Sequence, residues 1–206
     1  MNVNDTIAPA PPKTWAEMLP MIFLKQEQLM TRYRDIEKLP DWPVSLHTHS
    51  GQKVLKDFAW RTVEELTESY EAWFKHKHRE EGEVHALEEL ADAMHFFVEL
   101  CLFAGVGVHQ CLVATKDFPP VRRHSASSDA YWQVTFKLGV AMNFLKNKAW
   151  KESQVPTDVN RFCNALLDTY VAMLLLWADL GYTQEHLFSY YFRKAQVNEF
   201  RQRSSY

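Results

Sequence analysis

The chain has 206 residues, 47% of them hydrophobic, and is therefore long enough to bury a sizeable core without disulfide bonds. Its 23 lysines and arginines against 26 aspartates and glutamates give a net charge of −3 with no long basic run, which argues against nucleic acid as a partner. The three cysteines are odd in number and lack a CxxC spacing, which indicates reduced thiols and a cytoplasmic protein.

The first 13 residues are predicted to be disordered because prolines interrupt them at positions 9, 11 and 12. They have neither the basic start nor the apolar run of a signal peptide. The most apolar internal stretch, residues 93–108, contains His95 and Glu99. We therefore expect no membrane span.

Apolar residues recur at spacings of three and four, and the whole chain has only six glycines. This pattern predicts an all-α fold, a bundle of about six helices in a single domain over residues 14–206. The first helix is expected to follow Thr14, which has a capping-box spacing with Glu17, and Pro20 is expected to restart or kink it. A loop at 39–51 leads to a second helix at about 53–78 and a third at about 84–104.

Residues 117–129 read DFPPVRRHSASSD, and consecutive prolines followed by serines predict an exposed, mobile loop. Two further helices are expected at 131–150 and 157–180. Gly181 is predicted to end the second of them, and Thr183 to cap a last helix that runs to about residue 203.

Carboxylates form two pairs on the second and third predicted helices, Glu65 with Glu68 and Glu89 with Asp92. Residues three apart share one edge of a helix, so antiparallel packing of the two helices would bring all four together. Such a cluster repels itself unless a hard dication sits among its oxygens, and Mg²⁺, with Mn²⁺ as the alternative, suits this chemistry. The other interpretation is that the acidic run of the second helix is only a solvated face.

The last predicted helix carries Tyr191, Lys194, Asn198 and Arg201 at spacings of three, four and three. One narrow stripe therefore presents two cations and an amide. A phosphate chain would suit this stripe, because arginine offers a bidentate fork and lysine a point charge. The alternative is a solvated terminal helix with Tyr191 half buried.

The acidic motif resembles that of the all-α NTP pyrophosphatases, which comprise MazG-like enzymes, dimeric dUTPases and the phage dCTPase/dUTPase group. Members of this superfamily look like ExxE, a gap, then ExxD followed closely by His-Phe, and the chain reads EELTES and ELADAMHF. The C-terminal YYFRKAQVNEFRQRSSY also resembles the dUTPase/dCTPase ending. The two matches lie in the same order as in the family.

The resemblance implies a magnesium-dependent diphosphohydrolase that cleaves a deoxypyrimidine triphosphate, dUTP first and dCTP second, to the monophosphate and pyrophosphate. It implies metal ligands at Glu65, Glu89 and Asp92, with Glu68 as the fourth, and Glu65 as the general base. The substrate contacts it implies are Gln26, Tyr191, Lys194, Asn198 and Arg201. It further implies a homodimer and a variable helical insertion at about 117–180.

Two positions depart from the family pattern. Thr62 stands where the first carboxylate of ExxE is expected, which leaves Glu68 or Glu64 to replace it. Met30 stands where the family has an asparagine that contacts the pyrimidine, while Gln26 is kept. The departures bear on the number of metal ions and on the choice of base, including a modified dNTP.

Two other functions fit parts of the same pattern. His95 follows Asp92 by three, as in a di-iron carboxylate bundle, although no second [DE]xxH lies on a plausible partner helix. A catalytically inactive helical dimer that acts as a regulator or scaffold is the second alternative, since a fold does not fix a function. Metal binding separates an enzyme from a scaffold.

Overall fold

The computed structural model describes residues 8–76, 80–122, 128–147 and 155–203. These residues form seven α-helices, and no strand occurs among them. The helices are α1 (Trp15–Glu37), α2 (His49–His76), α3 (Glu80–Ala104), α4 (Val108–Ala114), α5 (Ser128–Asn143), α6 (Val159–Asp179) and α7 (Gln184–Arg203). The predicted all-α class is confirmed.

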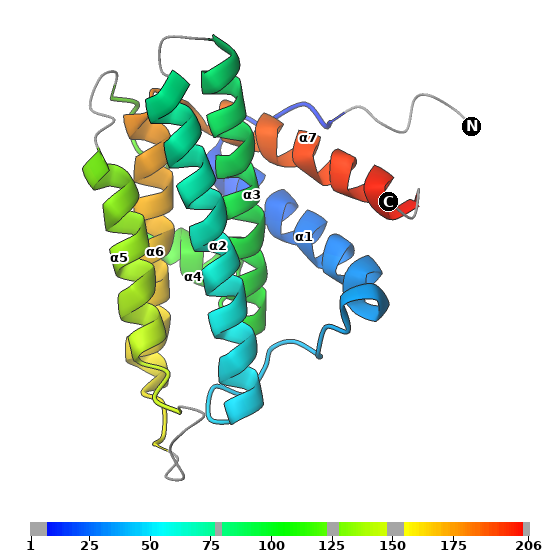
Figure 1. Cartoon of the computed structure of the whole chain (residues 1–206), viewed down its shortest axis with the longest axis vertical. Coiled ribbons are helices and arrows are strands. Elements are labelled where there is room, and N and C mark those ends of the chain that lie inside the picture. The colour runs from blue at the N-terminus through cyan, green and yellow to red at the C-terminus, as the bar shows by residue number, and fades with distance from the viewer. Residues whose placement is uncertain (1–7, 77–79, 123–127, 148–154, 204–206) are drawn as a thin grey trace.

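Helices α2 and α3 lie antiparallel beside each other, and α5 and α6 form a second antiparallel pair against them (Figure 1). Helices α1 and α7 cross the outer side of this bundle next to α3, and they also contact each other. The first and last long helices therefore meet on α3, although they lie far apart in the sequence. This arrangement positions the candidate site described below.

The ends of several helices follow the local signals in the sequence. The backbone N–H of Thr14 donates to the Glu17 carboxylate at 3.1 Å, so the predicted capping box at the start of α1 is present. Helix α1 continues through Pro20 to Glu37. Gly181 has a φ of +96°, which a residue without a Cβ adopts easily, and it follows the end of α6 as predicted.

The structure corrects the predicted helix count. A short helix, α4, follows Gly105, whose φ of +73° ends the run of α3. This helix escaped prediction because its seven residues are too few to show a helical period of their own.

Two predicted boundaries were also wrong. Helix α2 begins at His49, so the loop predicted at 39–51 ends earlier and Gly51 is helical. Helix α5 covers residues 128–143, which takes the last two residues from the predicted 117–129 loop and stops short of 150. Residues 123–127 and 148–154 lie outside the described parts of the chain.

The core runs through the bundle and contains large side chains from every long helix. Trp15, Phe97, Phe162, Tyr170 and Trp177 are each almost completely buried.

By length and composition α6 would suit a membrane span, and the sharply bent pair of α3 and α4 passes the same test as one segment. In α6, however, 61% of the most apolar window is buried inside the protein, which is the pattern of a core helix.

Candidate active site

Three carboxylates converge where α2 passes α3. One oxygen from each of Glu65, Glu89 and Asp92 lies within 4.8 Å of the other two, and all three side chains are half-buried. Antiparallel packing of the two helices brings them together, as the spacing of the acidic pairs predicts. Three oxygen ligands this close suit a hard dication.

The electrostatics of this group favour a bound cation. Burial, followed by the negative charges of Asp92, Glu89 and Glu68, raises the pKa of Glu65 to about 8. Burial also raises the pKa of Asp92, although the ammonium of Lys194 opposes the shift. Burial and mutual repulsion thus disfavour the ionised form of these carboxylates, and a divalent ion among their oxygens would offset both effects. The donor set therefore fits Mg²⁺.

Two basic side chains border the carboxylates. Nζ of Lys194 on α7 lies 2.6 Å from an Asp92 oxygen, and Nδ1 of His85 lies 3.2 Å from Glu89. The Lys194 side chain is 16% exposed and that of Asp92 is 20% exposed, so little solvent screens this ion pair. Helix α7 is thus tied to the acidic group through one charged contact.

The other α2 positions considered for the metal site are not part of this group of three carboxylates. Glu68 is exposed and is not one of the three convergent carboxylates, although its charge still acts on Glu65. Thr62 is buried, and its hydroxyl donates to the carbonyl of Phe58 at 2.8 Å, within its own helix. Glu64 is exposed and accepts a hydrogen bond from the indole N–H of Trp60 at 2.8 Å.

A pocket opens beside the carboxylates, and four helices line it. The lining residues are Gln26, Leu29, Tyr33 and Glu37 from α1, Glu65 from α2, Asp92, His95, Phe96 and Glu99 from α3, and Asn198 and Arg201 from α7. Five of the residues predicted as metal ligands or substrate contacts therefore line one space: Gln26, Glu65, Asp92, Asn198 and Arg201.

The deep end of this pocket contains a buried polar network centred on Gln26. Its terminal amide lies 2.6 Å from Oε1 of Glu99, 2.6 Å from Nδ1 of His95 and 2.5 Å from the hydroxyl of Tyr191. The His95 ring stacks on the ring of Tyr191 at 3.8 Å, and its Nε2 lies 3.0 Å from the Tyr191 carbonyl. Burial lowers the pKa of His95 to about 3, so its imidazole is neutral.

Both ring nitrogens of His95 thus have partners inside the protein. This placement gives the histidine a packing role and leaves neither nitrogen for a metal, unlike the ExxH ligands of a di-iron bundle. Tyr191 is also fully buried and does not line the pocket, so it reaches the pocket only through Gln26. On α7 the groups that face the acidic side are Lys194, Asn198 and Arg201.

Glu99 was not among the residues predicted for the site. It lies two helical turns after Asp92 on α3, so both fall on one side of the helix, and this spacing of seven was the available signal. Burial, and then the charge of Glu37, raises the pKa of Glu99 to about 8 against the opposing effects of Gln26 and Arg61. Burying a carboxyl costs free energy, so a carboxyl within the apolar stretch of α3 indicates that Glu99 has a role in this pocket.

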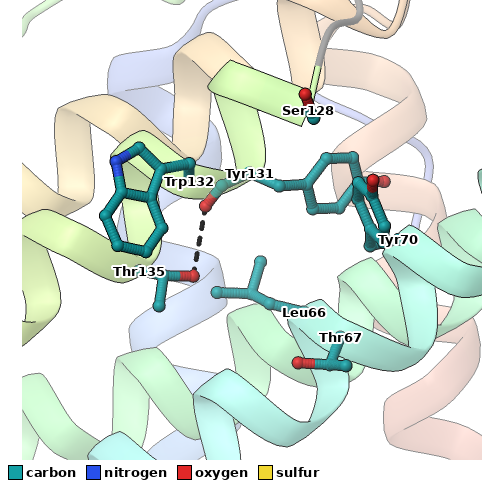
Figure 2. A pocket seen from close by; sticks show the side chains of 7 residues that line it. All are labelled: Leu66, Thr67, Tyr70, Ser128, Tyr131, Trp132 and Thr135. Atoms are coloured by element: carbon teal, nitrogen blue, oxygen red, sulfur yellow. Dashed lines mark hydrogen bonds between the residues drawn. The ribbon is translucent and has the colours of Figure 1, made fainter.

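A second concavity lies between α2 and α5 (Figure 2). Its lining residues are Leu66, Thr67, Tyr70, Ser128, Tyr131, Trp132 and Thr135. None of them is charged, and the Thr135 hydroxyl donates to the Tyr131 carbonyl of its own helix at 3.1 Å. It offers hydroxyl groups but no carboxylate, imidazole, thiol or cation, so the acidic pocket is the candidate active site.

One of three comparisons with known proteins found a match. A protein-family model described as dUTPase matches residues 48–206, which include α2, α3 and α7. A search of curated proteins and a search of solved structures each returned no match. Because the family match covers more than half of the chain and all three helices that carry the convergent carboxylates and Lys194, the chain belongs to the all-α dimeric dUTPase family.

Proposed function

We propose that the protein is a metal-dependent pyrophosphatase that hydrolyses a deoxypyrimidine triphosphate to the monophosphate and pyrophosphate. One observation carries the proposal: three convergent carboxylates, Glu65, Glu89 and Asp92, border a pocket that also presents the α7 groups Asn198 and Arg201. Acidic and basic groups that border one space suit a metal-bound phosphate chain. The dUTPase family match supports this chemistry.

Glu65, Glu89 and Asp92 are the residues that would hold Mg²⁺ or Mn²⁺, and Glu68 is the proposed fourth ligand because its charge already acts on Glu65. When bound, the ion would polarise the phosphoryl oxygens and neutralise charge that develops on them.

The chain's own residues supply the remaining steps. Glu65 is the proposed general base, since its carboxylate oxygen would take the proton of the attacking water within hydrogen-bond reach. The ammonium of Lys194 and the guanidinium of Arg201 would bind the phosphates and stabilise charge on the leaving pyrophosphate. Asn198 lies on the same pocket wall and would orient the nucleotide.

The family relationship gives dUTP as the first expected substrate and dCTP as the second. Gln26, with Tyr191 behind it, lies at the deep end of the pocket, where a base would be enclosed. A site built on hydrogen bonds rejects a base that leaves its polar groups unpaired. Thus the choice of base depends on which donors and acceptors this end of the pocket presents.

The proposed assembly is a homodimer in the cytoplasm, as the family relationship suggests. Sedimentation at micromolar concentration should give a particle of twice the 24.2 kDa chain mass. A compact monomer at that concentration would contradict the dimer.

A screen for pyrophosphate release over all common and modified dNTPs, first with Mg²⁺ and then with EDTA, tests the activity. Release from a deoxypyrimidine triphosphate that EDTA abolishes is the expected result. Preference for a purine would reject the pyrimidine assignment but keep the pyrophosphatase. Release from no nucleotide would favour the inactive scaffold.

A further inference from the structure

Glu199 on α7 forms ion pairs with two cations of α1. Its Oε1 lies 2.5 Å from Nζ of Lys25 and 2.9 Å from a terminal nitrogen of Arg32. The two cations are separated by about two helical turns, so both project from one side of α1. The side chains of Glu199 and Lys25 are 16% and 17% exposed, whereas that of Arg32 is 46% exposed. The Lys25 contact is therefore the better shielded from solvent.

These ion pairs connect two walls of the active-site pocket. Gln26 and Tyr33, which directly follow the two cations in α1, line the pocket, and so does Asn198, which directly precedes Glu199 in α7. The three charged residues are not themselves among those that line it. The ion pairs thus join the α1 wall to the α7 wall from outside the space that a nucleotide would fill.

The C-terminal end of α7 has little apolar packing of its own. Ala195 is buried, but none of the residues 196–201 is, and the side chain of Phe200 is 71% exposed. The pocket groups Asn198 and Arg201 belong to this stretch. Their positions therefore depend on polar contacts between α7 and the neighbouring helices.

Helix α7 has one ion pair to α3 and one ion-pair cluster to α1. Lys194 pairs with Asp92 at 2.6 Å on α3, and Glu199 pairs with the cations of α1. The proposed function, on which this inference rests, assigns Lys194 to the phosphates and Asp92 to the metal, so a bound nucleotide competes for both members of the first pair. The Glu199 pairs lie outside the pocket and have no such competitor. They can hold the end of α7 while a nucleotide is bound.

We propose that Glu199 is a positioning residue whose ion pairs to α1 hold Asn198 and Arg201 in place against the phosphate chain. Glu199 touches neither the nucleotide nor the metal, and it acts chiefly through Arg201. The charge of Arg201 lowers the pKa of Asp92, which is consistent with a guanidinium near the acidic side of the pocket. Without the ion pairs this guanidinium can move away from the phosphates, although every group that contacts the substrate is still present.

A double-mutant cycle with Arg201 tests the inference. We expect Glu199→Gln to lower kcat/KM for dUTP and for dCTP by about tenfold, because glutamine keeps the shape of the side chain but loses its charge. Arg201→Met removes the group through which Glu199 acts, so adding Glu199→Gln to Arg201→Met should lower kcat/KM by less than about threefold more. A residue that only stabilised the fold would cause the same loss in both backgrounds, and that result would overturn the inference.

Exchange of the two charges is a second test. Glu199→Lys places three cations together and should lower kcat/KM by more than about tenfold, whereas Lys25→Glu combined with Glu199→Lys restores an ion pair and should return kcat/KM to within about threefold of wild type. Glu71→Gln is the matched control, because Glu71 pairs with Lys75 at 2.5 Å on the exposed side of α2. No recovery in the charge-exchanged protein, or an equal loss in Glu71→Gln, would contradict the proposal. If Glu199→Lys fails to fold, the double-mutant cycle decides.

Hydrogen exchange separates this inference from the proposed function, because it needs no turnover. In EDTA and without nucleotide, the backbone amides of residues 196–203 should exchange about fivefold faster in Glu199→Gln than in wild type, and at the wild-type rate in the charge-exchanged protein. Unchanged exchange in Glu199→Gln would overturn the inference. No turnover of any nucleotide by wild type would instead reject the proposed function, while the exchange rates would still show whether Glu199 holds the end of α7.

Discussion

Lys194 on α7 and Asp92 on α3 form an ion pair of 2.6 Å that joins the C-terminal helix to the acidic group. The two residues are distant in sequence, and neither helix alone forms a site. The pair sets a cation against the edge of three carboxylates, so that groups of opposite charge meet at one place.

Removing either α3 carboxylate should abolish turnover without unfolding the protein. Glu89→Ala and Asp92→Ala each delete a proposed ligand, and we expect kcat/KM to fall by at least about a hundredfold while the helical circular dichroism is kept. Glu64→Ala is the matched control, because Glu64 is exposed on α2 and bonds Trp60. Full activity in both α3 variants would show that Glu89 and Asp92 do not bind a catalytic metal.

Glu65 should make the metal-free protein less stable. Burial and three neighbouring carboxylates raise its pKa to about 8, so Glu65→Gln should raise the melting temperature in EDTA by relieving this repulsion. Added Mg²⁺ should stabilise wild type, by about 2.7 kcal/mol at a hundred times Kd, and should leave Glu65→Gln nearly unchanged. Equal stabilisation of both proteins in a thermal-shift titration would argue against Glu65 as a ligand.

Lys194 should contribute to phosphate binding. We expect Lys194→Met to lower kcat/KM for the triphosphate by about ten- to a hundredfold, because a charge-assisted contact in a poorly solvated site is lost. Arg193→Met is the control, since Arg193 is exposed and lies over the ring of Tyr190. Equal losses of kcat/KM in the two variants would mean that Lys194 acts only through its charge at a distance and makes no phosphate contact of its own.

The stability of the metal-free protein should depend on pH through Glu99. Its pKa is raised on folding, so the folded state binds its proton more tightly, and stability is highest below the ordinary pKa of about 4.5 and falls as pH rises through about 8. Urea unfolding in EDTA should show this decrease between pH 5 and 9, by at most about 4 kcal/mol from this group. Glu99→Gln should have a flatter profile, and identical slopes would contradict the buried neutral acid.

Spacings within single helices predicted which side chains share a face. They placed Glu89 with Asp92 on α3 and Lys194, Asn198 and Arg201 on α7, but they also included Glu68, which lies outside the three convergent carboxylates, and Tyr191, which does not line the pocket. The Thr14 capping box and the Gly181 stop were likewise local signals, because each acts over a few residues. These features need no knowledge of tertiary structure.

The Gln26 network could not be predicted in the same way. Gln26 contacts Glu99 and Tyr191, which lie 73 and 165 residues away in the sequence, so the network exists only after α1, α3 and α7 pack together. The raised pKa of Glu99 and the lowered pKa of His95 both come mainly from burial, which spacing does not reveal. Helix α4 escaped prediction because seven residues are too few to show a helical period of their own.

The central claim is that the protein splits a deoxypyrimidine triphosphate between its α and β phosphates in a metal-dependent step. Phosphorus-31 NMR of reactions with dCTP and with dUTP in Mg²⁺ tests it most directly. The account predicts equal amounts of nucleoside monophosphate and pyrophosphate, no orthophosphate, and no product in EDTA or with Asp92→Ala. Nucleoside diphosphate with orthophosphate, or unchanged product formation in EDTA, would contradict it.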